Sequence, residues 1–220
     1  MNTRCFMLIT ALLPAVLLVG CAIADAAPPA RDDTKPMDAK TMCTAFCHAG
    51  SRVDTECPGG FGKSDNDPVK LDASKPGKPD ELSLVALPSA AVSFHGMSRG
   101  FKLLLINRTH AEKTFAASDS TLNIIREAMD TDGKWKPIES LPRTFCGNSF
   151  HRVFLPAGHC WEFPVPEYTG TQKVRMRFAL LRGQKMDPLY SNEFDGSVNP
   201  EQFIQKVERY PWDPAEPAKK

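Results

Sequence analysis

The feature that most constrains the fold of this chain is a series of short apolar or alternating runs that begins at Leu82. In 173–180, apolar side chains occupy every second position, and Lys173, Arg175 and Arg177 stand between them. A period of two is typical of a β-strand with one buried face. Comparable runs lie at 82–87, 101–106, 122–129, 151–155, 160–165 and 189–194. The pattern predicts a mainly β domain over 81–210.

Turn sequences separate these runs. Asp130–Gly133 and Pro156–Gly158 both end in glycine and are typical of hairpin connections. Residues 122–129 lack strict alternation and also fit a helix, but their position before an Asp-Gly turn favours a strand. Such spacing predicts an antiparallel β-sandwich of the immunoglobulin-like kind. One short C-terminal helix is expected at 200–207, because Asn199 can act as an N-cap before Pro200.

Residues 1–20 have the pattern of an export signal, with a basic residue, an apolar run and small residues at its end. Leu18–Cys21 resembles the lipobox of bacterial lipoproteins, which implies lipid attachment to Cys21. Ala22 directly after it resembles the pattern of outer-membrane lipoproteins. The alternative is ordinary cleavage at Ala24 or Ala26, which would release a soluble periplasmic or secreted protein.

Residues 21–80 are rich in proline, and Phe46 and Phe61 are their aromatic residues. Such a stretch buries too little apolar area to offset the entropy of ordering it. We therefore expect a disordered N-terminal tether that carries a small cysteine-containing knot at 43–57. At the other end, 211–220 is expected to be a frayed tail.

The predicted domain resembles small exported immunoglobulin-like or fibronectin-like sandwiches in its general layout. The stretches Cys146–Pro156 and Tyr190–Phe194 resemble uncharacterised bacterial exported proteins. This resemblance implies an envelope lipoprotein with a β-sandwich head, and it brings no known activity. The charge adds an exclusion: 27 basic and 26 acidic side chains are balanced, which argues against a nucleic-acid partner.

The cysteines suit an oxidising compartment. If Cys21 carries lipid and the leader is removed, an odd number remains, so at least one thiol is unpaired or pairs between chains. We expect Cys57 to close a small loop with either Cys43 or Cys47. Pairing of Cys146 with Cys160 stays open. The candidate disulfide residues are Cys43, Cys47, Cys57, Cys146 and Cys160.

Cys43–His48 resembles the expanded C-x-x-x-C-H haem-attachment motif, which would make His48 the proximal ligand. The polar, proline-rich surroundings argue against the apolar helical pocket that a haem needs. Metal-ligand types also occur at Cys146, His151, His159 and Cys160, but their spacing matches no compact metal motif. No cofactor and no metal are therefore expected.

Gly96–Gly100 matches G-x-S-x-G, with Ser98 at the position of the nucleophile. A nucleophile elbow requires a helix after the serine, whereas the following residues, 101–106, have a strand pattern. We therefore expect a glycine-framed turn between two strands. The basic stripe Lys173, Arg175 and Arg177 is expected to be a solvated sheet face.

These observations favour a non-enzymatic binding module that recognises an envelope or secreted protein, as an inhibitor or an immunity-type protein does. Specificity is expected in the loops 142–150 and 183–188. The alternative is a redox, metal- or haem-binding envelope protein that uses Cys43, Cys47 and His48. A purely structural envelope protein without a ligand is a third hypothesis.

Overall fold

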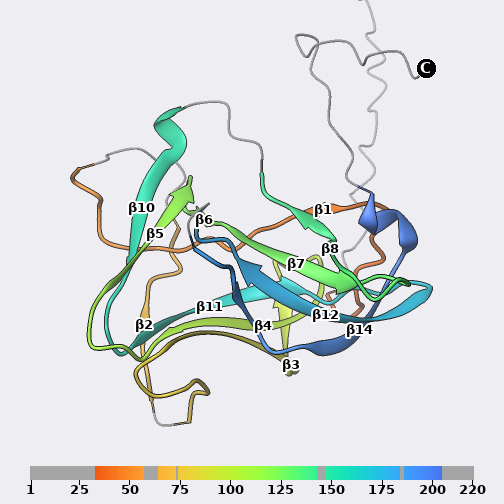
Figure 1. Ribbon diagram of the computed structural model, residues 1–220, viewed down its shortest axis with the longest axis horizontal. Helices are drawn as coiled ribbons and strands as arrows, with labels where there is room; N and C mark the ends of the chain where they lie inside the picture. Colours follow the sequence, from red (N-terminus) through yellow and green to blue (C-terminus); the bar gives the residue numbers. More distant parts are fainter. Residues whose placement is uncertain (1–32, 57–63, 73, 143–146, 184–185, 205–220) are drawn as a thin grey trace, which may run out of the picture. The chain divides into compact units, whose positions relative to one another are not determined.

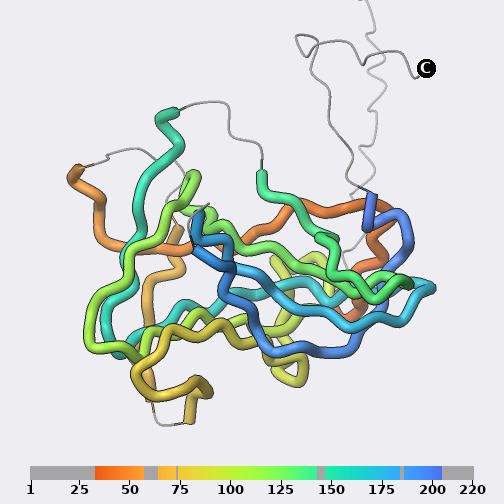
Figure 2. The backbone as a smooth tube through the Cα atoms, viewed as in Figure 1, coloured from red at the N-terminus to blue at the C-terminus, as the bar shows by residue number. Residues whose placement is uncertain are grey.

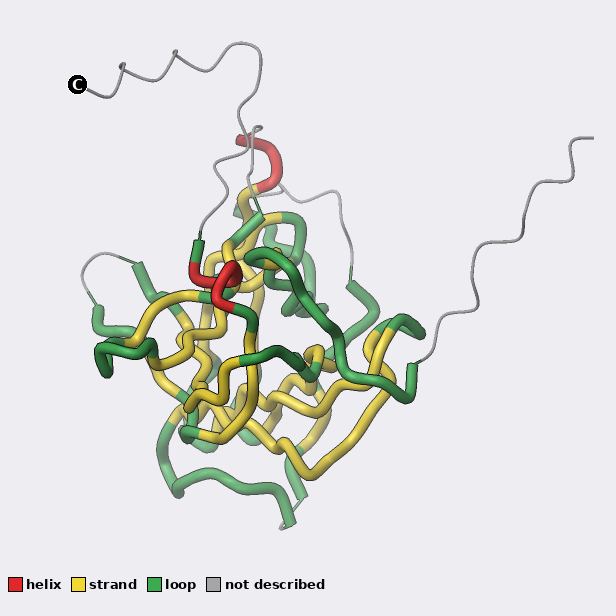
Figure 3. The backbone as a smooth tube through the Cα atoms, turned by 90° about the vertical axis from the view of Figure 1, so that its right-hand side faces the viewer, coloured by secondary structure: helices red, strands yellow, loops and turns green. Residues whose placement is uncertain are grey.

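The structure is a computed structural model that describes residues 33–56, 64–72, 74–142, 147–183 and 186–204. All of these residues belong to one compact unit, 31–220. This unit is mainly β, as predicted, and its two helical segments among the described residues are short 3₁₀ turns (Figures 1 and 3). In this part of the chain no helix has the length and apolarity that crossing a bilayer demands.

A four-stranded antiparallel sheet has the order β2-β11-β4-β3. Two further antiparallel sheets have the orders β10-β5-β6 and β13-β12-β7-β8, and β14 pairs with β12. A short parallel pair joins β1 to β9. The four-stranded sheet comprises β2 (Val69–Lys70), β3 (Leu82–Phe94), β4 (Ser98–Asn107) and β11 (His159–Pro166).

The other strands, apart from β12, are shorter than β3, β4 and β11, and Figure 2 shows their path along the chain. The three-stranded sheet comprises β5 (Lys113–Ser118), β6 (Thr121–Leu122) and β10 (Phe150–Leu155). The sheet around β12 comprises β7 (Ile124–Met129), β8 (Trp135–Pro137), β12 (Gln172–Leu180), β13 (Leu189–Tyr190) and β14 (Phe194–Val198). The parallel pair is β1 (Cys43–Thr44) with β9 (Glu139–Ser140), and η1 spans Gly147–Ser149.

The main hydrophobic core collects inward-facing side chains from all three antiparallel sheets. Leu105 of β4, Trp161 of β11 and Leu155 of β10 are fully buried in it. The alternation predicted for 173–180 is confirmed: Val174, Met176, Phe178 and Leu180 are buried, whereas Lys173 and Arg175 are exposed. The strand at 122–129 is also confirmed, as β6 and β7.

Of the two predicted hairpins, only Asp130–Gly133 is a hairpin. It joins β7 to β8, and Asp130 Oδ1 accepts the backbone N–H groups of Asp132 and Lys134. Pro156–Gly158 instead carries the chain between sheets, because β10 pairs with β5 and β11 pairs with β4. β4 and β5 also lie in different sheets. The antiparallel pair of β4 and β11 therefore continues into the pair of β5 and β10, and the four strands form one ribbon that bends between the sheets.

Asn107 stabilises this bend from a fully buried position. Its side-chain amide donates hydrogen bonds to the carbonyl oxygens of Ala111 and Leu155, each at 2.9 Å, and of Pro156 at 3.1 Å. The backbone carbonyl of Asn107 accepts the N–H of Gly158 at 2.9 Å. One side chain therefore joins the two places where the ribbon passes from one sheet to the other. Such bends are how strands turn a corner between sheets.

The described part of the expected tether packs against the sheets, which departs from the prediction of a disordered 21–80. Cys47 and Ala49 belong to the main core. The N–H of Ala49 donates to Ser120 O at 2.8 Å, and Trp161 Nε1 donates to Gly50 O at 2.9 Å. The segment needs few large apolar residues of its own, because the sheets provide the apolar surface and the hydrogen-bond partners.

Leu71 and Lys75, which follow β2, lie against the outer face of the four-stranded sheet. Leu71 packs against a small cluster of Leu104, Ile106 and Cys160. Arg108 donates a hydrogen bond to Lys75 O at 2.6 Å, and Lys75 pairs with Glu162. Both faces of β4 are therefore buried.

The helix predicted at 200–207 is not present in the described residues. Pro200–Phe203 form a 3₁₀ turn, η2, and Ile204 is already extended, with φ −97° and ψ 108°. Residues 205–207 lie outside the described part. The side chain of Asn199 donates instead to Asp38 Oδ1 at 2.7 Å and to Ala39 O at 2.8 Å. Asn199 is the N-cap of η2, with Pro200 after it as predicted, but the turn is 3₁₀ and the Asn199 side chain also fixes the N-terminal segment.

Candidate functional site

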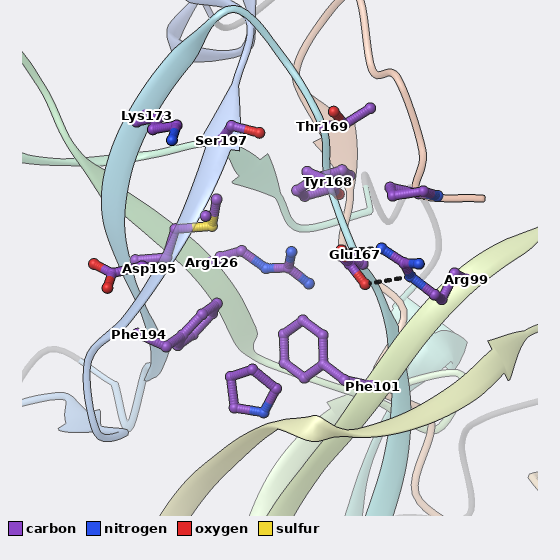
Figure 4. A pocket seen from close by; sticks show the side chains of 14 residues that line it. Arg99, Phe101, Arg126, Glu167, Tyr168, Thr169, Lys173, Phe194, Asp195 and Ser197 are labelled. Atoms are coloured by element: carbon purple, nitrogen blue, oxygen red, sulfur yellow. Dashed lines mark hydrogen bonds and ion pairs between the residues drawn. The ribbon is translucent and has the colours of Figure 1, made fainter. Parts of the chain in front are cut away.

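A cavity of about 500 Å³ lies beside β4, β12 and β14 (Figure 4). Its apolar lining includes three aromatic rings, and its polar lining includes charged side chains of both signs. Its apolar lining includes Phe101 of β4, Tyr168 after β11, Met176 of β12 and Phe194 of β14. The charged ones are Arg99, Arg126, Glu167, Lys173 and Asp195.

Arg126 points to the centre of this site (Figure 4). It lies on the inward face of β7, between Ile124 and Ala128, and is fully buried. Its Cζ atom lies 4.5 Å from the ring centroid of Tyr168 and 4.7 Å from that of Phe178. The negative faces of aromatic rings attract a guanidinium at such distances. The aromatic surroundings therefore stabilise the charge without providing hydrogen bonds.

Glu139 of β9 is the acidic neighbour of Arg126 and is 5% exposed. Its Oε1 lies 3.5 Å from Arg126 Nε and accepts the hydroxyl of Tyr168 at 2.9 Å. Its Oε2 accepts the backbone N–H of Arg126 at 3.0 Å. Burial, and after it the charge of Glu139, raises the pKa of Tyr168 well above its usual value. The phenol is therefore a neutral donor that fixes the carboxylate.

The guanidinium of Arg126 is left without hydrogen bonds. Nε, Nη1 and Nη2 are all buried, and none has a hydrogen-bond partner among the described residues. A guanidinium presents five N–H donors. Burying a charged donor without partners costs several kcal/mol in general, so native proteins rarely leave one in this state. This buried guanidinium, which lies near Glu139 but makes no hydrogen bond, is the most unusual chemical feature of the cavity.

The remaining charges of the lining are partly compensated. Arg99 and Glu167 form a two-point pair, Nε to Oε2 and Nη2 to Oε1, both at 2.7 Å. Their side chains are 42% and 37% exposed, so this pair lies at the edge of the site. Lys173 and Asp195 are both exposed. The lining thus holds three basic and two acidic side chains.

The structure gives free thiols to three of the candidate disulfide residues: Cys43, Cys47 and Cys160. Cys57 and Cys146 lie outside the described residues, as does the candidate lipidation site Cys21. Burial raises the pKa of all three described thiols. Within the described chain, therefore, these thiols are neutral side chains in apolar surroundings.

The haem-like motif is not gathered around one space. Cys47 belongs to the main core, whereas Cys43 packs against a second cluster that includes Tyr168 and Ile138. His48 forms an isolated bridge with Thr121, and burial lowers its pKa. The two thiols of this motif thus contact different hydrophobic clusters.

The other metal-ligand types are also engaged separately. His151 Nε2 accepts the N–H of Ser120 at 2.9 Å, and His159 Nδ1 lies 2.9 Å from Ala157 O. Cys160 is buried in the small cluster with Leu104 and Ile106. In the part of the chain that the structure describes, no three His, Cys, Asp or Glu side chains come together as metal ligands would.

Ser98 is the first residue of β4 and directly follows a turn from β3, as the glycine-framed turn prediction requires. His95 and Gly96 both have positive φ in this turn, 50° and 65°. Ser98 is 5% exposed, and its hydroxyl has no hydrogen-bond partner among the described residues. The strand that follows excludes the elbow geometry of a hydrolase.

The basic stripe on β12 is paired with acidic and aromatic neighbours. Arg175 pairs with Glu193, and Arg177 Nε donates to Glu127 at 2.8 Å. Arg177 also lies 3.7 Å from the ring centroid of Tyr190. This arrangement agrees with an ordinary sheet face, although Lys173 reaches the cavity.

The residues that define the cavity escaped sequence reasoning. The sequence holds only a weak signal for Arg126, which lies two positions from Ile124 and from Ala128 in a run without strict alternation. Glu139 and Tyr168 carry no such signal, because distant segments bring them to Arg126. The comparisons give no further guidance: the chain matches no protein-family model, no curated protein and no solved structure.

Proposed function

We propose that this chain is a non-enzymatic binding module and that the cavity beside Arg126 is its binding site. The cavity itself is the observation that carries the proposal. Its volume, about 500 Å³, and its aromatic walls with a few polar groups are typical of ligand sites. The layout of the lining supports recognition, since its side chains surround a space large enough for a small ligand or a terminal residue.

The chemistry of the lining supports binding rather than catalysis. Among its described residues there is neither a histidine nor a cysteine. Arg99 and Glu167 are bonded to each other, and Ser197 Oγ accepts the N–H of Gly170 at 3.2 Å. Nucleophilic catalysis needs a nucleophile activated by a base within hydrogen-bond reach. The described side chains provide contacts instead.

We further propose that the module acts in the cell envelope, on an envelope or secreted protein partner. The leader at 1–20 and the lipobox-like Leu18–Cys21 support export and lipid attachment, with an outer-membrane location. The common core between the four-stranded sheet and the other two supports an immunoglobulin-like sandwich. Palmitate labelling that disappears in Cys21→Ser would support the anchor, and unchanged labelling would contradict it.

A cavity-filling substitution tests the binding site. A Cβ atom at Gly196 would lie 2.4 Å from Met176 Cε, the mobile end of a side chain that lines the cavity. Gly196→Leu should therefore push Met176 into the cavity without backbone strain. Ala111→Leu is the matched control, because Ala111 is exposed in the loop between β4 and β5 and does not line the cavity.

The measurement is cross-linked capture of partners from an envelope extract of the organism that encodes the chain. We expect the unmodified chain and Ala111→Leu to capture the same partner, and Gly196→Leu to lose at least nine-tenths of it. Equal capture by all three proteins, or reproducible capture by none, would contradict the proposal. Circular dichroism and the unfolding midpoint confirm that Gly196→Leu is folded.

A further inference from the structure

We propose that the cavity binds a single carboxylate attached to an apolar, preferably aromatic, body, and that Arg126 holds the carboxylate. This inference rests on the proposed function and specifies the ligand chemistry of the same site. It is drawn from the lack of hydrogen bonds at the Arg126 guanidinium, from the charges around this group and from the side chains that surround it.

The first step is the hydrogen-bonding state of Arg126. Nη1 and Nη2 have no hydrogen-bond partner among the described residues, and Glu139 Oε1 lies 3.5 Å from Nε. Two parallel N–H groups of a guanidinium match the two oxygens of a carboxylate, and this two-point geometry gives short, charge-assisted hydrogen bonds. An incoming carboxylate would supply the partners that the Nη atoms lack. Arg99, in contrast, already uses its fork on Glu167.

The second step is the charge that the site can accept. Arg99 and Glu167 compensate each other, and Lys173 and Asp195 are single charges of opposite sign in the lining. Among the lining residues, all of which the structure describes, Arg126 is then the one fully buried cation. Glu139, behind Arg126, would repel a second negative charge on a ligand. The balance favours a monoanion over a doubly charged phosphate.

The third step is the body of the ligand. Phe101 and Phe194 form an edge-to-face pair with centroids 5.3 Å apart, and Tyr168 and Met176 complete the apolar lining. Aromatic side chains prefer such offset or edge contacts with another ring, so an aromatic body suits these walls. A small hydrophilic anion would leave them without contacts.

The fourth step is access. The guanidinium nitrogens are buried, so the carboxylate reaches them only when a lining side chain turns aside. Met176 is suited to this movement, because methionine is unbranched and has several rotatable bonds. A Cβ at Gly196 would lie 2.4 Å from Met176 Cε, so Gly196→Leu should block the movement as well as fill the space.

The same chemistry has two sources: a free organic acid, or the C-terminal residue of a polypeptide. Calorimetric titration of the purified full-length chain distinguishes them with two pairs of probes. One pair is 3-phenylpropionate and 3-phenylpropanamide. The other is a hexapeptide ending in phenylalanine, with a free or an amidated C-terminus. Inorganic phosphate is the control for a ligand that is only an anion.

We expect the acid form of at least one pair to bind at least ten times more tightly than its amide, and phosphate not to compete. A preference confined to the small acid assigns a free acid as the ligand, and a preference shown by the peptide pair assigns a chain terminus. Equal affinity of acid and amide in both pairs, or no binding by any probe, would overturn the proposal.

Arg126→Met combined with Glu139→Gln removes both buried charges and should reduce the acid-to-amide ratio to within about twofold. Arg175→Met combined with Glu193→Gln makes the same changes at the ion pair between Arg175 of β12 and Glu193, which does not line the cavity, and should keep the ratio. A retained ratio in the folded first variant overturns the role of Arg126. If that variant does not fold, the acid-to-amide ratio of the unmodified chain decides.

The failures of the two proposals are distinguishable. Equal binding of acid and amide that disappears in Gly196→Leu would contradict the carboxylate and leave the cavity as a binding site. If no probe binds but partner capture is lost in Gly196→Leu, the carboxylate proposal is again contradicted and the cavity again remains a binding site. The proposed function is contradicted if Gly196→Leu captures the partner as well as the unmodified chain does, or if no variant captures a partner reproducibly.

Discussion

Two arginines of this molecule face a buried carboxylate, and their surroundings differ. Arg152 donates from Nε and Nη2 to Asp54, at 2.8 and 2.6 Å, and its backbone N–H adds a third bond at 3.1 Å. Arg152 also pairs with Glu56 at 2.8 Å. Arg126 has only Glu139, 3.5 Å away, and no hydrogen bond to its guanidinium among the described residues.

The difference separates a structural ion pair from a prepared binding group. The Asp54 side chain is 2% exposed and its oxygens are saturated by donors, so this pair stabilises the segment before β2 against β10. Arg126 is held by rings and by a carboxylate on one side, which leaves its Nη groups available. Groups arranged for binding commonly reduce stability, because their partners are absent until the ligand arrives.

The largest effect is expected at the structural pair. Arg152→Met would leave the buried Asp54 carboxylate without its cation, so the unfolding free energy should fall by clearly more than in the control variant. Urea denaturation of the two proteins measures the loss. Arg175→Met is the control, because its exposed pair with Glu193 should contribute under about 1 kcal/mol. Equal losses in both variants would contradict the comparison.

An intermediate effect is expected at alkaline pH, to which groups near Arg126 contribute together with Cys160, whose pKa is also raised by burial. Burial raises the pKa of Cys47, Cys43 and Tyr168, and the charge of Glu139 raises all three further. Above about pH 8.5 an unfolded cysteine loses its proton while these folded groups keep theirs. The unfolded state then binds fewer protons, so stability must fall as the pH rises.

Each such group contributes a slope of up to about 1.4 kcal/mol per pH unit. Urea denaturation at pH 7, 9 and 10 should therefore show a steady decline. Cys47→Ala, although less stable at neutral pH, should show a shallower decline than the unmodified chain. Parallel curves for the two proteins would show that Cys47 does not ionise differently in the folded and unfolded states.

The smallest effect is expected where both charges of the Arg126 pair are removed. Arg126→Met with Glu139→Gln should change the unfolding free energy by within about 1 kcal/mol, because neutral groups of similar size replace a poorly paired buried ion pair. The corresponding Arg152→Met with Asp54→Asn should lose more, since it removes saturated hydrogen bonds. The two double variants, unfolded in urea side by side, measure this contrast. A loss of several kcal/mol in the first would assign Arg126 to the structural class.

The sequence was informative wherever the structure depends on neighbouring residues. The alternation of 173–180 predicts a strand because side chains point to opposite faces in turn, and Asp130–Gly133 predicts its hairpin because Asp130 bonds the turn itself. Pro156–Gly158 looked similar, but its role depends on which strands pair with β10 and β11. That choice is made by contacts far away in the chain, so local turn chemistry does not determine it.

The N-terminal segment and the site escaped prediction for related reasons. Ala45, Cys47 and Ala49 are small, and they fill gaps in a core that other residues build. Arg126 breaks the apolar face of its strand, which sequence reasoning could have noticed. Its acidic neighbour Glu139 lies beyond a hairpin, and Tyr168 follows another strand, so only the folded chain brings them together.

The bent ribbon of β4, β5, β10 and β11 has a consequence for how the molecule comes apart. Each half of the ribbon supplies paired strands to a different sheet, and Asn107 bonds both crossing points. If one of the two sheets came apart, the ribbon strands that continue into the other sheet would also lose backbone hydrogen bonds. The two sheets should therefore melt as one cooperative unit, and partial opening should be confined to segments outside the ribbon.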